Sequence, residues 1–255
     1  MMRLAAQWAV FLLAVQFLTR LPVPRDPGYT PARFEAVPRY FPAVGLVVGI
    51  CVAAVYLLTA QVAPPALAAL VSTAAGLLIT GCFHEDGFAD ACDGLGGGRT
   101  REAALEIMRD SRLGTYGAAG LGLMLAGKVM TLGTLPAPVA AAALVAGHAA
   151  SRASVVLVIA TSRYARDQGA GKPVAAGVRR ADLVIALAFG ALGLLLLLPL
   201  AGPVSLAGGV AGLFGGHLAM RARFERRLEG YTGDCLGAVQ QTSEIGLYLG
   251  VLACL

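Results

Sequence analysis

Residues 65–83 read PALAALVSTAAGLLITGCF, and residues 84–98, which follow directly, read HEDGFADACDGLGGG. The first stretch is uncharged and matches the roughly 20 apolar residues that a helix needs to cross a bilayer. The second stretch holds four carboxylates and ends in a glycine run. An apolar segment of this length joined to such an acidic one predicts a membrane helix that ends at a chemically active polar face.

The whole chain repeats this contrast. Of its 255 residues, 57% are hydrophobic and only 14% are charged, whereas soluble domains carry about 25% charged residues. We therefore expect an all-α polytopic membrane bundle of about seven transmembrane helices, forming one domain over residues 1–255. A shorter apolar stretch, Leu4–Thr19, predicts an interfacial or re-entrant helix, with a full span as the alternative. The predicted spans are Pro38–Gln61, Pro65–Phe83, Tyr116–Leu135, Ala137–Ala160, Leu183–Ala201, Pro203–Met220 and Leu236–Leu255.

The distribution of Lys and Arg predicts the orientation. Three connections between the predicted spans are short and uncharged, whereas segments 20–39, 84–115, 161–182 and 221–235 carry 17 of the 20 Lys and Arg residues. Threading the chain through a bilayer puts these four segments on one side, and an excess of positive residues marks the cytoplasmic side. We expect a cytoplasmic (inner) membrane protein with its polar face in the cytoplasm. The net charge of +5 is thus an orientation signal and does not indicate a nucleic-acid partner.

The acidic segment predicts a metal site. On a helix, Asp86, Asp90 and Asp93 stand at i, i+4 and i+7 and share one face, with Glu85 beside them. Like charges on one face repel each other unless a cation neutralises them. Oxygen ligands favour Mg²⁺ or Mn²⁺, so the metal ligands that this spacing predicts are Asp86, Asp90 and Asp93. The alternative is a solvated acidic loop.

The neighbouring residues predict a site for phosphate groups. Glycine allows successive backbone N–H groups to turn toward an anion, so Gly96 and Gly97 are predicted to cradle a phosphate. In residues 109–112, two arginines flank an Asp-Ser pair and suit a bidentate grip on a diphosphate. The predicted substrate-binding residues in this stretch are His84, Gly96, Gly97, Arg109, Ser111 and Arg112. In a phosphoryl transfer at this site, Asp93 or Asp110 is predicted to be the base that accepts the proton of the attacking hydroxyl group.

Charged residues inside the apolar spans are a second signal. Lys128 and Arg152 fall in the cytoplasmic halves of two predicted spans, and such residues usually face a cavity or a partner. They are predicted either to bind an anionic substrate or to pair with the carboxylates. Glu244, within the final span, is predicted to face the interior. Thr232 and Asp234, just before that span, complete the predicted substrate-binding set, although Asp234 near a helix start is also a candidate N-cap.

Four motifs, taken in order, resemble the cobalamin synthase family, adenosylcobinamide-GDP ribazoletransferase. They are FLTRLPVP (17–24), HEDGFADACDGLGGG (84–98), IMRDSRLGTYG (107–117) and YTGDCLGA (231–238). The resemblance implies transfer of the adenosylcobinamide phosphoryl group from adenosylcobinamide-GDP to α-ribazole, or its 5′-phosphate, with Mg²⁺ present and GMP released. It also implies metal or catalytic roles for the acidic positions Glu85, Asp86, Asp90 and Asp93.

Two other classes remain as alternatives. One is another intramembrane transferase that uses diphosphates, of the CDP-alcohol or prenyl type. Asp90, Asp93 and Gly94 match the opening of the CDP-alcohol phosphotransferase motif, but Gly114 stands where that family needs its last carboxylate. The other class is a cation transporter, which should carry ionisable residues near the bilayer midplane, often in paired repeats. The acids here lie at one surface, which disfavours a transporter.

Overall fold

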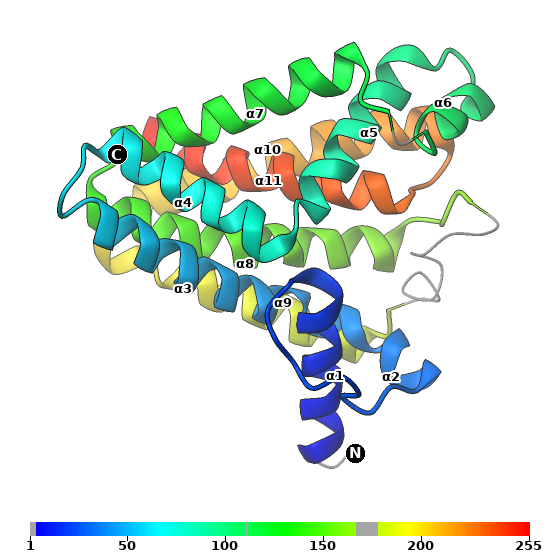
Figure 1. The fold of residues 1–255 in the computed structure, drawn as a ribbon, viewed down its shortest axis with the longest axis horizontal. Helices are drawn as coiled ribbons and strands as arrows, with labels where there is room; N and C mark the ends of the chain where they lie inside the picture. Colours follow the sequence, from blue (N-terminus) through cyan, green and yellow to red (C-terminus); the bar gives the residue numbers. More distant parts are fainter. Residues whose placement is uncertain (1–3, 111, 167–177) are drawn as a thin grey trace.

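The computed structural model describes residues 4–110, 112–166 and 178–255, and their secondary structure is helical, which confirms the predicted all-α class (Figure 1). A 3₁₀ turn, Val37–Tyr40, precedes α3. The α-helices are α1 (Leu4–Leu18), α2 (Pro31–Glu35), α3 (Phe41–Thr59), α4 (Pro65–Thr80), α5 (Phe83–Gly97), α6 (Arg101–Ile107), α7 (Thr115–Thr134), α8 (Ala137–Thr161), α9 (Arg180–Leu195), α10 (Leu198–Leu228) and α11 (Gly233–Ala253).

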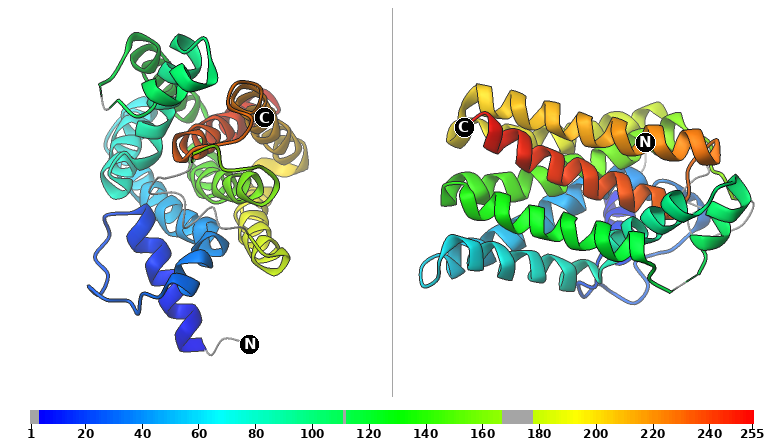
Figure 2. Two further views of the ribbon diagram at one scale, coloured as in Figure 1. Left: turned by 90° about the vertical axis from the view of Figure 1, so that its right-hand side faces the viewer. Right: turned by 90° about the horizontal axis from the view of Figure 1, so that it is seen from above.

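Helix α8 is the centre of the bundle. Its most apolar stretch is 94% buried, and α3, α9 and α11 pack around it (Figure 2). The helix is rich in Ala, Gly and Ser, and such small residues let neighbouring backbones approach closely. Gly45 and Gly49 of α3 lie directly against the α8 backbone at His148 and Val145. The middle of the bundle is therefore held by close backbone packing more than by large side chains.

Three described helices, or four when α4 and α5 are taken as one bent span, are long and apolar enough to cross a membrane. They are the helix ending at Thr59, which includes the 3₁₀ turn, together with α8 and α10. Helices α4 and α9 have 16 residues each, while α7 and α11 carry polar residues such as Lys128 and Glu244. Several long apolar helices indicate a multi-pass membrane protein.

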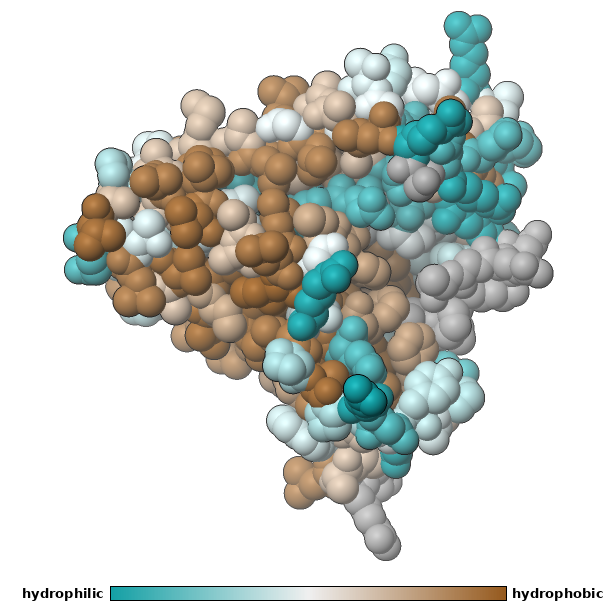
Figure 3. All heavy atoms as spheres, viewed as in Figure 1, coloured by the Kyte–Doolittle hydropathy of each residue, from teal (hydrophilic) through white to brown (hydrophobic). Residues whose placement is uncertain are grey.

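The described parts of the charged segments gather at one end of the bundle, together with α5 and α6 (Figure 1). Apolar atoms cover the flank formed by α3, α4 and α7, and polar atoms cover the charged end (Figure 3). Hydrogen bonds tie the charged segments to one another: Arg101 donates to the carbonyl oxygens of Leu228 and Ala165. Arg39 and Asp182 form a buried ion pair at 2.6 Å. The segments predicted to lie on one side of the bilayer are thus neighbours in space.

Two predicted boundaries need correction. Helix α9 ends at Leu195, six residues before the predicted end at Ala201. Helix α10 continues to Leu228, so the first part of the predicted charged loop 221–235 is helical. The cause is the amphipathic sequence after Met220, in which Phe224 and Leu228 are buried while charged side chains lie between them. The predicted break at residue 202 is present, because Gly202 has φ 78° and Pro203 follows.

A sharp corner separates α4 from α5 and positions the acidic helix. Gly81 and Cys82 both adopt left-handed conformations, with φ 64° and 59°, and the two helices meet at 92°. Glycine tolerates this conformation, while it costs Cys82 of the order of 1 kcal/mol. Because of the corner, α5 turns away from the direction of α4 and lies across the charged end.

The seam between α10 and α11 depends on glycines that face each other. A Cβ on Gly212 would overlap the carbonyl group of Gly246, whereas a Cβ on Gly215 would meet nothing within 4 Å. We expect Gly212→Val to lower the free energy of unfolding by about 1–3 kcal/mol, because overpacking at close helix contacts forces the backbones apart. Thermal unfolding in detergent measures the change. Gly215→Val is the matched control, and equal melting temperatures for the two variants would contradict this account of the seam.

Candidate active site

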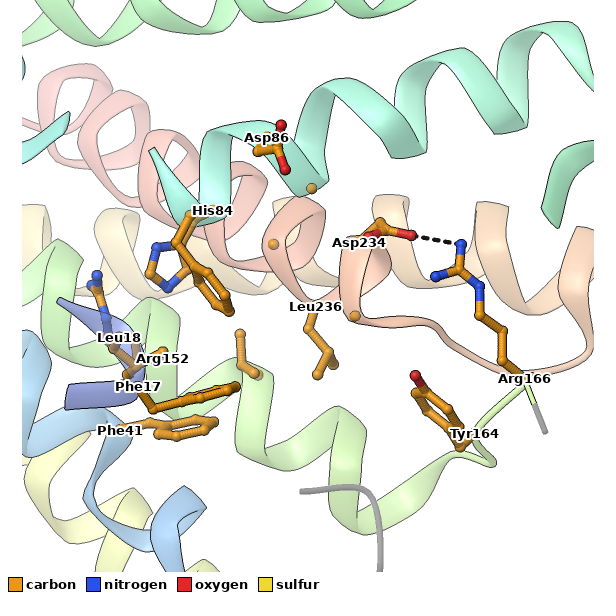
Figure 4. A pocket seen from close by; sticks show the side chains of 15 residues that line it. Phe17, Leu18, Phe41, His84, Asp86, Arg152, Tyr164, Arg166, Asp234 and Leu236 are labelled. Carbon is orange, nitrogen blue, oxygen red and sulfur yellow. Dashed lines mark hydrogen bonds and ion pairs between the residues drawn. The ribbon is translucent and has the colours of Figure 1, made fainter. Parts of the chain in front are cut away.

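A pocket with a volume of about 210 Å³ lies at the charged end of the bundle, between α1, α3, α5, α8 and the start of α11. Asp86 and Asp234 lie on one side of it, and the rings of Phe17, Phe41 and Tyr164 lie on the other (Figure 4). Four predicted site residues line this one pocket: His84, Asp86, Arg152 and Asp234.

Glycines bring the two acidic residues together. Gly87, next to Asp86, packs against the backbone of Asp234, where an added Cβ would lie 3.0 Å from the Asp234 Cα atom. Gly237, one turn further along α11, lies in the same way against the carbonyl group of His84. A side chain at either glycine would separate α5 from α11, and with them the two carboxylates.

Asp234 forms an ion pair and does not cap its helix. Thr232 is the N-cap of α11 and accepts the N–H of Cys235, which settles the alternative that the sequence left open. The Asp234 carboxylate instead accepts a hydrogen bond from Arg166 at 2.9 Å and another from the Thr232 hydroxyl at 3.1 Å. The predicted residues Thr232 and Asp234 thus lie together, with Thr232 fully buried behind Asp234.

Asp90 lies one turn from Asp86 on the polar face of α5, which lies across the end of the bundle rather than along its spanning helices. Partial burial, followed by the negative charges of Asp234, Asp86 and Asp93, raises the pKa of Asp90 to about 7. A carboxyl group loses its proton less readily where neighbouring carboxylates repel the new charge. This corner of the site therefore holds an excess of negative charge that a cation would relieve.

The other two predicted metal ligands point elsewhere. The Asp93 carboxylate accepts the backbone N–H groups of Gly114 at 2.8 Å and Gly117 at 2.9 Å. It therefore satisfies free N–H groups at the start of α7, where a negative charge is stabilising. Glu85 is buried and accepts a hydrogen bond from Gln241 at 2.7 Å. Helix α5 confirms the predicted helical phasing, but packing separates its carboxylates into different surroundings.

No group of three or more His, Cys, Asp or Glu side chains within residues 4–110, 112–166 and 178–255 is close enough to hold a metal ion. The predicted convergence of all four acids on one cation is therefore not the arrangement observed. Asp86, Asp90 and Asp234 are the carboxylates that remain near the pocket.

Lys128 and Arg152 lie in a buried polar cluster in the middle of the bundle. Lys128 donates to Glu244 at 2.7 Å and to Gln241 at 2.6 Å, which confirms that Glu244 faces the interior. Arg152 is 1% exposed and donates to the carbonyl oxygen of His148 at 2.9 Å. Of the two alternatives for Lys128, pairing with a carboxylate is the one observed, although its partner is on α11 and not in the acidic segment.

The glycine run does not form the predicted phosphate cradle. Gly96 and Gly97 are the last residues of α5, so their N–H groups follow the helix axis instead of converging on a ligand. A Cβ on Gly96 would overlap the ring of Tyr116, and one on Gly94 would overlap the side chain of Met108. The glycines let α6 and α7 pack closely against α5.

In the stretch 109–112, Arg109, Asp110 and Arg112 do not line the pocket. Arg109 is exposed, and Ser111 lies outside the described residues. Arg112 is 88% exposed and pairs with Asp110 at 2.5 Å. Hydrogen bonds from Arg112 lower the pKa of the Asp110 carboxyl, so Asp110 is a weak proton acceptor near neutral pH. The predicted role of this stretch as a diphosphate grip has no geometric support.

Sequence reasoning missed several pocket residues. Arg166 lies in a positively charged segment, which by itself indicates only membrane orientation, and Tyr164 belongs to no motif. Phe17 belongs to the motif FLTRLPVP, in which no residue has a predicted chemical role. Phe41 lies within an apolar run and gave no separate signal. Aromatic residues occur on lipid-facing helix surfaces as well as in pockets, so the sequence does not distinguish the two. The packing of α1 against α3 shows that the rings of Phe17 and Phe41 line a pocket.

The fold and the site together define a class: a polytopic helical membrane protein with an acidic, arginine-bearing pocket at its charged end. The CobS family model, described as cobalamin-5-phosphate synthase, matches residues 10–252. The chain therefore belongs to the cobalamin-5-phosphate synthase family and is an enzyme of cobalamin biosynthesis, which confirms the predicted family.

Three curated relatives show how far the similarity extends. A protein named adenosylcobinamide-GDP ribazoletransferase from Ralstonia pickettii (strain 12J) is 42% identical, covering 98% of this chain and 97% of its own. Proteins of the same name from Ralstonia nicotianae and Leptothrix cholodnii are 44% and 45% identical, covering 94% and 96% of this chain and 93% and 95% of their own. No solved structure matches the chain.

Proposed function

We propose that this chain transfers the adenosylcobinamide phosphoryl group from adenosylcobinamide-GDP to α-ribazole, or its 5′-phosphate, in the pocket beside Asp86 and Asp234. One observation supports placing the reaction in this pocket. Three of the four motifs, although far apart in the sequence, supply residues to this single pocket: Phe17, Asp86 and Asp234. The fourth motif supplies Gly114 and Gly117, which anchor Asp93 of the same acidic helix.

The reaction needs a nucleophile, a leaving group and a proton acceptor. A ribose hydroxyl oxygen of α-ribazole forms a bond to the phosphorus attached to cobinamide, and the bond between that phosphorus and the GMP oxygen breaks. The hydroxyl proton passes to a carboxylate on the polar face of α5, either Asp86 or Asp90. Arg166 contributes positive charge beside Asp234 as charge spreads over the phosphoryl oxygens.

The donor set fits a magnesium ion. Mg²⁺ binds through one or two carboxylates together with substrate phosphates, so it does not need a preformed cluster of three. Asp86 and Asp234 would hold the ion, and its charge would offset that of the neighbouring carboxylates, which together with burial, the larger cause, raise the pKa of Asp90. When bound, the ion neutralises the diphosphate and the developing negative charge.

The membrane arrangement follows from the same reasoning. The proposal is one membrane domain with seven spanning helices, α3, α4 and α7–α11, and with α1 at the interface. The charged end, which holds the pocket and residues 84–117, faces the cytoplasm because its connections carry most of the Lys and Arg. This orientation gives water-soluble substrates access from the cytoplasm.

The experiment is release of GMP from adenosylcobinamide-GDP by the purified full chain in proteoliposomes. We expect release that depends on both α-ribazole and Mg²⁺, with adenosylcobalamin as the second product. CDP-alcohols and prenyl diphosphates, supplied in place of adenosylcobinamide-GDP, test the other transferase classes. Turnover of one of those substrates, with no release of GMP from adenosylcobinamide-GDP, would refute the assignment.

A further inference from the structure

The pocket has two chemically different ends. At one end lie Asp86, Asp234 and Arg166, which suit phosphate and hydroxyl groups. At the other end lie Phe17, Leu18 and Phe41 (Figure 4), and the apolar side chains of Phe83 and Val155 also line the pocket. A site that bound only a diphosphate would gain nothing from this apolar end.

The aromatic end is an ordered platform. The rings of Phe17 and Phe41 are stacked, with centroids 5.9 Å apart and planes at 11°. Phe83 meets the edge of Phe17 at 5.4 Å and is 46% exposed at the charged end of the molecule. Aromatic rings that line a pocket favour a planar ring as their ligand.

One hydrogen-bond donor at this end lacks a partner. Arg152 lines the pocket, is 1% exposed, and its Nε atom makes no hydrogen bond within the described part of the chain. Its guanidinium lies beside His84 near the stacked rings (Figure 4). Leaving such a donor unpaired costs free energy, so a ligand with one acceptor at this position would be stabilised.

We propose that the aromatic end of the pocket holds the base of α-ribazole, with its free ring nitrogen accepting a hydrogen bond from Arg152. The inference rests on the proposed function and adds an orientation to it. The base packs against the stacked pair formed by Phe17 and Phe41, and the ribose hydroxyl points toward Asp86 and Asp234.

The chemistry of the substrates favours this base over the other candidates. A benzimidazole-type base has an apolar rim and one free ring nitrogen, which matches an apolar slot with one unpaired donor. The edge of guanine carries several donors and acceptors, which would lose their hydrogen bonds against Phe17, Phe83 and Val155. The corrinoid is far larger than a pocket of about 210 Å³, and must lie outside it.

The first test compares KM values for the two substrates in the purified full chain. We expect Phe41→Leu to raise the KM for α-ribazole about tenfold, because ring stacking contributes roughly 1–3 kcal/mol per base. The KM for adenosylcobinamide-GDP should not change. Phe189→Leu is the matched control, since Phe189 also contacts a neighbouring ring, that of Tyr40, but lies outside the pocket.

The second test leaves the protein unchanged. An α-ribosylindole carries C–H in place of the free ring nitrogen, and we expect it to bind the wild-type chain about tenfold more weakly than α-ribazole. Binding of each nucleoside alone is measured by titration, so this result does not depend on turnover. Failure of the proposed function would appear as no release of GMP by the wild type. A rise in the KM for adenosylcobinamide-GDP in Phe41→Leu, or equal binding of the two nucleosides, would overturn the inference.

Discussion

Replacing Asp86 or Asp234 by asparagine is expected to lower kcat at least about 100-fold, and the exposed Asp86→Asn should do so while leaving the melting temperature unchanged. Both carboxylates line the pocket, and Asn keeps their size while removing the charge that a cation and a transferred proton require. Initial rates of GMP release, measured against Mg²⁺ concentration, report the loss. We expect part of the loss to be recovered at high Mg²⁺, because a weakened site still binds the ion when the ion is abundant.

Asp110→Asn is the matched control for this prediction. Asp110 also stands in a motif of the family, but it pairs with Arg112 at the surface, with 39% of its side chain exposed. We expect this variant to keep its rate within about twofold, since exposed ion pairs contribute little. Loss of activity in Asp110→Asn together with full activity in Asp86→Asn would show that the reaction takes place near Asp110 and not in the pocket.

Glu244→Gln is expected to lower the free energy of unfolding by about 3 kcal/mol. Glu244 is the centre of the buried cluster: it pairs with Lys128 at 2.7 Å and accepts hydrogen bonds from Gln240 at 2.5 Å and Tyr248 at 3.1 Å. Removing its charge leaves the Lys128 ammonium buried without a counter-ion, and breaking a buried pair from one side costs about 3–5 kcal/mol. Unfolding in mixed micelles of increasing denaturing detergent measures the change.

The double variant Lys128→Met/Glu244→Gln separates pairing from simple damage to the core. Because both charges are gone, we expect it to regain more than half of the stability lost in Glu244→Gln. Glu225→Gln on α10 is the control, since Glu225 pairs with Arg221 at 3.2 Å near the surface, and should change stability by less than about 0.5 kcal/mol. A double variant less stable than Glu244→Gln would show that the two side chains do not stabilise each other as an ion pair.

The buried cluster also bears on the position of the acidic helix. Gln241 bonds both to Lys128 and to Glu85 of α5, so hydrogen bonds run from the core of the bundle to the helix that carries Asp86. Disturbing the cluster should therefore affect the geometry of the pocket as well as stability. This indirect route explains how Lys128 can matter without contacting the substrate.

Local sequence accounts for much of the architecture. The boundaries of α7 and α8 were predicted within a residue of those observed, because long apolar runs bounded by Gly or Pro leave few alternatives. The helical phasing of Asp86 and Asp90 was also predictable, since it depends only on the repeat of the helix. The family could be predicted because its motifs are contiguous stretches of sequence.

The tertiary structure decided which predicted residues share a site. Asp93 and Asp86 lie on the same predicted helix face, yet Asp93 binds the start of α7 and Asp86 lines the pocket. The partner of Asp234 is Arg166, 68 residues away, and no local pattern marks such a pair.

The sequence by itself therefore determined the helices, their polar and apolar faces, and the family of the protein, because these depend on residues close together in the chain. Only the tertiary structure decided that α1, α5 and α11 meet around one pocket, and that glycines at the acidic segment serve packing instead of phosphate binding. The physical reason is that a side chain's role depends on what lies within a few ångströms of it. In a bundle of helices, those neighbours come from distant parts of the chain.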